Sequence, residues 1–325
     1  MKRPSFFLVG AAKCGTTALY EGLRKHPEIF MPHSEDPQRF WLHKEPFHFC
    51  GDLGIADWLR VAERDDFLNL FKEASEQAIC GTASAWEAFS QEAPERIKEF
   101  EPEAKIIIML RPPVTWMRSW HHDLLRYGYE DQVDFGQALA MAEERVAGRK
   151  MPSRAAFAGC LQYRKAARFS EQVTRYYDVF GRENVFVGLH EDLEKNQTEF
   201  TRNLLQFLGV DSSIPLVVER TNDSSVLKGT HHFDLAVERV VDRLPGGEGL
   251  KSWFGRSLKR RYRHLADKIF APMSNKSISS VLEEELLEEF EPEVAQLGEL
   301  IGRDLSHWNE PRFPRNAHEH DSHHH

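Results

Sequence analysis

Gly10-Ala11-Ala12-Lys13-Cys14-Gly15-Thr16-Thr17 lies between a short apolar run, residues 6–9, and an amphipathic segment, residues 17–26. This order predicts a buried strand, a glycine-rich turn and a helix. Small residues allow backbone N–H groups to surround an anion, and the N-terminus of a helix adds partial positive charge. The two threonine hydroxyls add further donors. The segment therefore predicts a phosphate-binding loop, although a glycine-rich turn alone would fit an ordinary strand–helix connection.

The loop has the spacing of the nucleoside-triphosphate P-loop, G-x-x-x-x-G-K-[ST], but Thr16 stands where that motif has its lysine. The lysine lies inside the loop instead, at Lys13. A triphosphate P-loop works with Mg²⁺, which an acidic residue at the end of a second strand helps to hold. Here the apolar run 106–110 ends in Arg111, which is suited to bind a phosphate directly. We therefore expect an anionic nucleotide and no metal.

Apolar runs alternate with helical patterns along most of the chain. The expected strands are 6–9, 78–81, 106–110 and Val185–Leu189. The expected helices are 17–26, Pro113–Tyr127, 163–180, 200–208 and 281–301. This alternation predicts parallel βαβ units in a three-layer α/β fold. We expect one domain over residues 1–309, in which 245–276 cover one edge of the sheet, and a disordered, histidine-rich tail over 310–325 that is partly an expression tag.

Composition narrows the class of protein further. The 325 residues carry a net charge of −9, which argues against a broad nucleic-acid-binding surface. No apolar run approaches the roughly 20 residues of a membrane-spanning helix, and Lys13 interrupts the short run that could open a signal peptide. The four cysteines form no CxxC pair, so neither a disulfide framework nor a zinc site is predicted. We expect a cytoplasmic protein and leave its oligomeric state open.

These residues resemble the sulfotransferases that use 3′-phosphoadenosine 5′-phosphosulfate (PAPS), in particular bacterial members related to the heparan-type enzymes. Four segments carry the resemblance, in the family's order: 6–17 (FFLVGAAKCGTT), 44–49 (KEPFHF), 106–113 (IIIMLRPP) followed by Ser119, and 300–308 (LIGRDLSHW). The resemblance implies a P-loop-type phosphosulfate-binding loop. It also implies transfer of a sulfuryl group from PAPS, as co-substrate, to a hydroxyl or amine.

The resemblance assigns the co-substrate contacts residue by residue. Lys13 would stabilise charge on the bridging oxygen as the sulfuryl group leaves. Arg111 and Ser119 would bind the 3′-phosphate, and a later basic loop would close over it. The loop residues that would hold the 5′-phosphosulfate are Ala12, Lys13, Cys14, Gly15, Thr16 and Thr17. The residues expected in the closing loop are Asn222, Lys228 and Gly229, with Arg260 and Arg261 as alternatives.

Glu45 is the expected general base, because its place in Lys44-Glu45-Pro46 matches the family segment that supplies that base. The family motif continues with histidine and then phenylalanine, whereas this chain has Phe47-His48. In an extended strand such a shift turns a side chain to the opposite face, which argues against the family histidine's role for His48 and leaves Glu45 the stronger candidate. The swapped order makes His48 the competing base. Lys44 would bridge base and sulfuryl group, or be an exposed lysine. Two residues near 81–86 extend the match: Ser84 near the co-substrate and Trp86 as core or pocket wall.

The acceptor is not specified by these motifs. We expect the variable segments 31–53, 127–154 and 244–280 to build its pocket. The negative net charge favours a small molecule, a lipid-like alcohol or a carrier-bound intermediate over a highly sulfated polysaccharide. A kinase-like phosphotransferase and a non-catalytic nucleotide-binding protein remain the alternatives.

Overall fold

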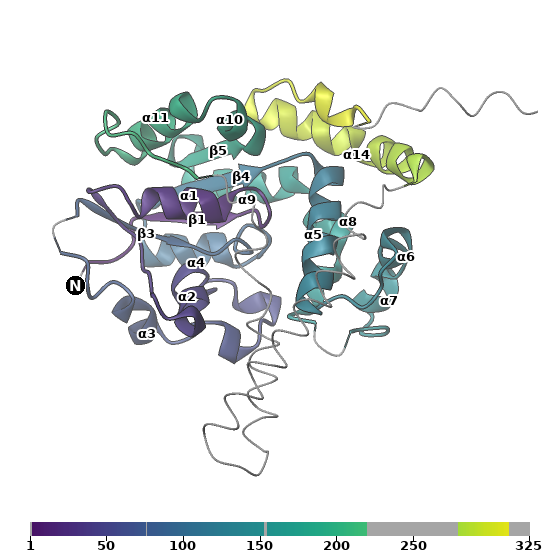
Figure 1. Ribbon diagram of the computed structural model, residues 1–325, viewed down its shortest axis with the longest axis horizontal. Coiled ribbons are helices and arrows are strands. Elements are labelled where there is room, and N and C mark those ends of the chain that lie inside the picture. Colours follow the sequence, from purple (N-terminus) through teal and green to yellow (C-terminus); the bar gives the residue numbers. More distant parts are fainter. Residues whose placement is uncertain (1, 76, 153–154, 220–278, 312–325) are drawn as a thin grey trace, which may run out of the picture.

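A computed structural model of the chain describes residues 2–75, 77–152, 155–219 and 279–311 (Figure 1). Five parallel strands form one sheet in the order β2-β3-β1-β4-β5. The strands are β1 (Phe6–Gly10), β2 (Ile29–Phe30), β3 (Ile79–Ala83), β4 (Lys105–Leu110) and β5 (Val185–Leu189). The predicted α/β class with a parallel sheet is confirmed.

Helices cover both faces of the sheet. The helices are α1 (Thr16–Leu23), α2 (Pro37–Lys44), α3 (Arg64–Asn69), α4 (Ala93–Phe100), α5 (Pro113–Tyr127), α6 (Phe135–Ala140), α7 (Ala142–Val146), α8 (Tyr163–Ala166), α9 (Phe169–Phe180), α10 (His190–Lys195), α11 (Gln197–Leu208) and α14 (Ser280–Ile301). The connection from β1 to β2 runs toward one edge of the sheet, whereas the connection from β3 to β4 runs toward the other edge. Right-handed crossovers therefore place α1 and α4 on opposite faces. Strands β1 and β4 are buried along almost their whole length, which explains their continuous apolar runs.

Most predicted elements form within a few residues of their expected bounds, but the prediction of one helix over 163–180 is wrong. The structure has α8 and α9 there, separated at Ala167 and Arg168. The carboxylate of Glu293, on α14, accepts hydrogen bonds from the backbone N–H and the hydroxyl of Ser170 at 2.6 and 2.7 Å. This distant carboxylate satisfies the first turn of α9 and stabilises a new helix start.

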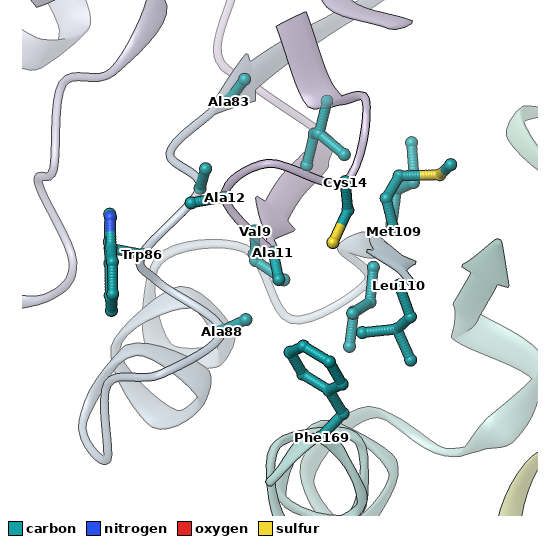
Figure 2. Packing of buried hydrophobic residues seen from close by; sticks show 14 of the residues in the cluster. Val9, Ala11, Ala12, Cys14, Ala83, Trp86, Ala88, Met109, Leu110 and Phe169 are labelled. Atoms are coloured by element: carbon teal, nitrogen blue, oxygen red, sulfur yellow. The ribbon is translucent and has the colours of Figure 1, made fainter. Parts of the chain in front are cut away.

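The loop after β1 is tightly packed against its surroundings. Figure 2 shows the small side chains of Ala11 and Ala12 at this point, with Ala88 close to the end of β1. A Cβ atom added to Gly10 would lie 2.5 Å from Cβ of Ala88, so only glycine fits there. Cys14 is buried and lies near Met109 and Leu110 in the same view. The loop is therefore held against the core by its close contact with Ala88 and by the buried side chain of Cys14.

Several expectations concern residues that lie outside the described ranges. They are the edge-covering segment 245–276, the residues of the closing loop, Asn222, Lys228, Gly229, Arg260 and Arg261, and the tail from residue 312 onward. Among the helices that the structure does describe, none is both long enough and apolar enough to span a membrane.

Candidate active site

The loop between β1 and α1 has the backbone of an anion-binding turn. Gly15 adopts a left-handed conformation (φ 87°) immediately before α1, and no side chain caps the first turn of that helix. Lys13 also has a positive φ of 62°. Thr16 is buried at the start of α1, whereas Thr17 is half-buried. The N–H groups at this end of the helix and the threonine hydroxyls are thus available to an anion.

Two side chains from the next strand–helix unit hold the loop in place. Nη1 of Arg111, which follows β4, donates a hydrogen bond to the carbonyl oxygen of Lys13 at 3.0 Å. Nε1 of Trp116, on α5, donates to the carbonyl oxygen of Ala12 at 2.6 Å. These bonds engage two carbonyl oxygens that would otherwise repel an anion. Arg111 thus lies beside the loop, and its expected contact with the 3′-phosphate stays a prediction.

Lys13 is half-buried and forms an ion pair with Asp123 of α5, with 2.9 Å between Nζ and Oδ1. Asp123 follows Ser119 by four residues, so the two lie on one side of α5. Lys13 of the loop therefore contacts the side of α5 that also carries Ser119.

Burial raises the pKa of the Cys14 thiol to about 12, although Arg111 and Lys13 lower it. Cys14 is a neutral packing residue at pH 7.

The segment of the expected base begins at the end of α2 and is not a strand. Lys44 is the last residue of that helix, and Phe47 has a positive φ of 48°. The expectation that side chains alternate between two faces here is therefore wrong. Lys44 is also not exposed: its side chain is 1% exposed and pairs with Oε1 of Glu45. Glu45 itself is 8% exposed.

One residue, Ala85, joins the base segment to the phosphate loop through its two backbone polar groups. The N–H of Ala85, in the turn after β3, donates to Oε2 of Glu45 at 2.6 Å. The carbonyl oxygen of the same residue accepts a hydrogen bond from the N–H of Ala12 at 3.1 Å. The carboxylate and the loop are thus attached to opposite sides of Ala85. The structure brings together Glu45 and the loop residues, which are distant in sequence.

Tyr127, the last residue of α5, is influenced by the charges of both Asp123 and Glu45. Burial raises the pKa of this phenol, and the charges of Asp123 and Glu45 raise it further. Both carboxylates therefore lie within electrostatic reach of one side chain at the end of α5.

His48 lies in an aromatic cluster. Its Nδ1–H donates to the carbonyl oxygen of Val61 at 2.7 Å, and its ring stacks on Phe67 with centroids 4.3 Å apart. Burial lowers the pKa of His48, and three nearby arginines lower it further, although the bond to Val61 opposes this. Trp86 is buried against Trp116 and Trp120, so it is a core residue.

Sequence reasoning missed Asp123, Trp116 and His190. A Cβ atom on Gly15 would lie 2.9 Å from Cδ2 of His190, the first residue of α10. His190 directly follows β5, as Arg111 follows β4, and carboxyl ends of parallel strands meet at one edge of a sheet. That rule could have identified His190. A pocket of about 260 Å³ opens beside Arg111; its lining includes Arg118, His190, Glu191, His307 and Trp308.

The fold and this site define a class of α/β proteins that bind an anionic nucleotide through a loop after the first strand. Comparison with known proteins identifies the family. Residues 3–236 match the sulfotransferase domain, and the chain belongs to that family. The predicted family is thereby confirmed.

Individual relatives agree with this assignment. Mouse carbohydrate sulfotransferase 15 is 32% identical over 152 residues, which cover 36% of this chain and 26% of the relative. Mouse heparan sulfate glucosamine 3-O-sulfotransferase 6 is 33% identical over 114 residues, covering 34% and 28%. The chain thus spans about a quarter of the length of the curated relatives it matches. The crystal structure of a sulfotransferase from Alicyclobacillus acidocaldarius is 29% identical, with a TM-score of 0.66 over 95% of this chain and all of that chain.

Proposed function

We propose that this protein transfers a sulfuryl group from PAPS to a hydroxyl or amine of a small acceptor, with Glu45 as general base and without a metal. Membership of the sulfotransferase family implies PAPS as co-substrate. The observation that carries the proposal is the double attachment at Ala85, because it holds a carboxylate beside the phosphate loop. The base that takes the acceptor's proton must lie next to the site that holds the sulfuryl donor.

The residues present fit a 5′-phosphosulfate and a 3′-phosphate. The proposal assigns the 5′-phosphosulfate to the backbone of residues 12–17, the hydroxyls of Thr16 and Thr17, and Lys13. It assigns the 3′-phosphate to Arg111 and Ser119. The left-handed Gly15 and the uncapped start of α1 support the first assignment, and the position of Arg111 at the edge of the loop supports the second. Asn222, Lys228 and Gly229 remain proposed contacts outside the described residues.

Glu45 takes the proton of the acceptor as the acceptor oxygen or nitrogen forms a bond to sulfur. The bond between sulfur and the bridging oxygen of the phosphosulfate breaks at the same time. Lys13 stabilises the charge that develops on that oxygen, which leaves as part of adenosine 3′,5′-bisphosphate. Lys44, paired with Glu45, orients the carboxylate before the transfer.

We infer that the acceptor is a small molecule, a lipid-like alcohol or a carrier-bound intermediate. The net charge of −9 disfavours a highly sulfated polysaccharide, which would be repelled. A carbohydrate is the second candidate, because two of the relatives are named for action on carbohydrate or heparan sulfate glucosamine. Both candidates present hydroxyl or amine groups to Glu45.

Calorimetric titration tests the nucleotide assignment. Adenosine 3′,5′-bisphosphate should bind without Mg²⁺, and a chelator should leave its affinity unchanged. Binding of ATP only with Mg²⁺ would instead indicate the kinase-like alternative. Transfer of radiolabelled sulfate from PAPS to octyl glucoside, glucosamine or a simple phenol tests the reaction itself. Tight binding with no transfer and no slow hydrolysis of PAPS would indicate a non-catalytic nucleotide-binding protein.

A further inference from the structure

The turn that follows β3 contacts the base segment at more points than Ala85 alone. Three bonds run between residues 84–87 and residues 45–49. Ala85 donates its N–H to Glu45, Ser84 Oγ accepts from the N–H of Phe47 at 3.0 Å, and Glu87 Oε1 accepts from the N–H of Phe49 at 3.4 Å. The contacts alternate along the base segment, so they fix its path as well as one side chain.

Ser84 supports the strained point of that path. Its side chain is fully buried, and its hydroxyl accepts the hydrogen bond from Phe47. Phe47 is in the left-handed region, which a residue with a large side chain adopts only when its surroundings enforce it. Phe47 lies two residues after Glu45. A change in its backbone would therefore alter the direction from which Glu45 enters the site.

Glu87 is a buried carboxyl group whose pKa is influenced by no cation of the described residues. Its Oε2 is buried and has no hydrogen-bond partner among the residues that the structure describes. The groups that face it are Glu45, Ser84, Cys50 and Tyr176. Burial and, to a smaller degree, the charge of Glu45 raise the pKa of Glu87, whereas the contacts from Phe49 and Ser84 lower it; the net result is a pKa of about 8. Glu87 is accordingly neutral at pH 7 and places no second negative charge beside Glu45.

We propose that Ser84 and Glu87 are positioning residues for sulfuryl transfer, which act through Glu45 by holding the segment that carries it. Neither residue needs to touch the acceptor or the nucleotide. The inference rests on the proposed function, because it assumes that Glu45 is the base. Glu87 contributes as a neutral hydrogen-bonding group of fixed size.

The test measures release of adenosine 3′,5′-bisphosphate from PAPS, with octyl glucoside or glucosamine as acceptor, or with water where neither is used. Ser84→Ala should lower kcat by about 10- to 100-fold, the range expected when a base is misplaced by a fraction of an ångström to one ångström. The KM for PAPS should change by less than about threefold, because the phosphate loop keeps its own contacts. Glu87→Ala should lower kcat similarly, and Glu87→Gln should restore it to within about threefold of wild type.

Ser90→Ala is the matched control for Ser84. Ser90 is also fully buried, and its hydroxyl also accepts backbone hydrogen bonds, from Glu92 and Ala93. This variant should lose thermal stability without a loss of kcat in the folded protein. Any loss of kcat in Ser84→Ala that exceeds its loss of folded protein is then a positioning effect.

A double variant separates positioning from independent damage. If Ser84 acts through Glu45, Ser84→Ala combined with Glu45→Gln should be no slower than Glu45→Gln alone. A double variant that shows the product of the two single losses would overturn the proposal, as would wild-type kcat in Ser84→Ala. Equal losses in Glu87→Gln and Glu87→Ala would overturn the neutral role of Glu87. A fully active Glu45→Gln enzyme would instead refute the base assignment of the proposed function.

Discussion

Two buried carboxylates, Glu130 and Glu45, are held in very different ways. Glu130 follows α5 and accepts two hydrogen bonds from Arg145, both at 2.6 Å, and one from the hydroxyl of Tyr163 at 2.7 Å. The N–H groups of Asp131 and Gln132 donate two more, at 2.9 and 2.8 Å. The side chains of Glu130 and Arg145 are 0% exposed. Every acceptor position of this carboxylate is therefore in use.

Glu45 has two partners among the described residues, Lys44 and the N–H of Ala85. A carboxylate that only supports the fold is best saturated with donors, whereas one that must accept a proton keeps capacity for it. Glu87 completes the series with a single backbone donor. Burial raises the pKa of both Glu130 and Glu87, but the hydrogen bonds to Arg145, Gln132 and Tyr163 lower the pKa of Glu130 below its ordinary value.

Replacing Glu45, the proposed base, should give the largest effect on catalysis. Glu45→Gln should lower kcat by about 10²- to 10⁴-fold and leave the affinity for adenosine 3′,5′-bisphosphate nearly unchanged. The glutamine keeps the shape and the bond from Ala85, but it cannot accept the acceptor's proton. Steady-state kinetics and calorimetry measure the two quantities.

The control for this prediction is His48→Ala, because His48 is the competing base. A Glu45→Gln enzyme with normal turnover beside an inactive His48→Ala enzyme would assign the base to His48. Normal turnover in both variants would show that the acceptor loses its proton without a protein base, as an acidic phenol can.

Removing a partner of Glu130 should lower the stability of the fold and leave the catalytic rate of the folded protein unchanged. Arg145→Ala leaves the buried charge of Glu130 without its cation, and removal of one partner of such a pair destabilises a protein by about 3–5 kcal/mol. Urea unfolding measures this change. The matched control is Arg149→Ala, which breaks the exposed pair with Glu144 and should change stability by about 0–1 kcal/mol. Equal changes in the two variants would show that the buried ion pair contributes no more to stability than the exposed one.

Glu87 predicts a dependence of stability on pH. Because its pKa rises from the ordinary 4.5 to about 8 on folding, the folded state binds more protons than the unfolded state between these values. Its contribution to stability is therefore fully present below about pH 4.5 and declines as the pH rises to about 8. Relative to wild type, Glu87→Gln should gain up to a few kcal/mol over that interval. Parallel unfolding curves at pH 5, 6.5 and 8 check this, and a constant difference between the two proteins would refute it.

Arg111 extends the comparison to an arginine whose proposed role is to bind a phosphate of the substrate. Arg111→Ala should weaken binding of adenosine 3′,5′-bisphosphate by about 1.5–3 kcal/mol, since a guanidinium forms charge-assisted hydrogen bonds to a phosphate. Adenosine 5′-phosphate, which lacks the 3′-phosphate, should lose much less. Arg164→Ala, at an exposed pair with Glu289, is the control for a general loss of positive charge. Equal losses for both nucleotides would show that Arg111 does not bind the 3′-phosphate.

The elements that sequence reasoning found are those whose signal is local. The continuous apolar run at β4 and the small residues of the loop each determine their own structure. The break between α8 and α9 depends on Glu293, more than a hundred residues away. Asp123 is equally distant from Lys13, and the contact between them exists only once β4 and α5 are placed beside the loop. Such contacts have no sequence signal because the partners are brought together by the fold.

The bond between Glu130 and Arg145 has a practical consequence for protein engineering. These residues stand at the two ends of the segment 131–144, which contains α6 and the start of α7. Because Arg145 and Glu130 bind each other directly, their ion pair holds the two ends of that segment together. We therefore expect that the segment can be replaced by other sequences if this ion pair is retained, while Lys13, Glu45 and the turn after β3 stay in place. Because residues 127–154 are expected to help build the acceptor pocket, a library of such exchanges would test that expectation through changes in acceptor preference.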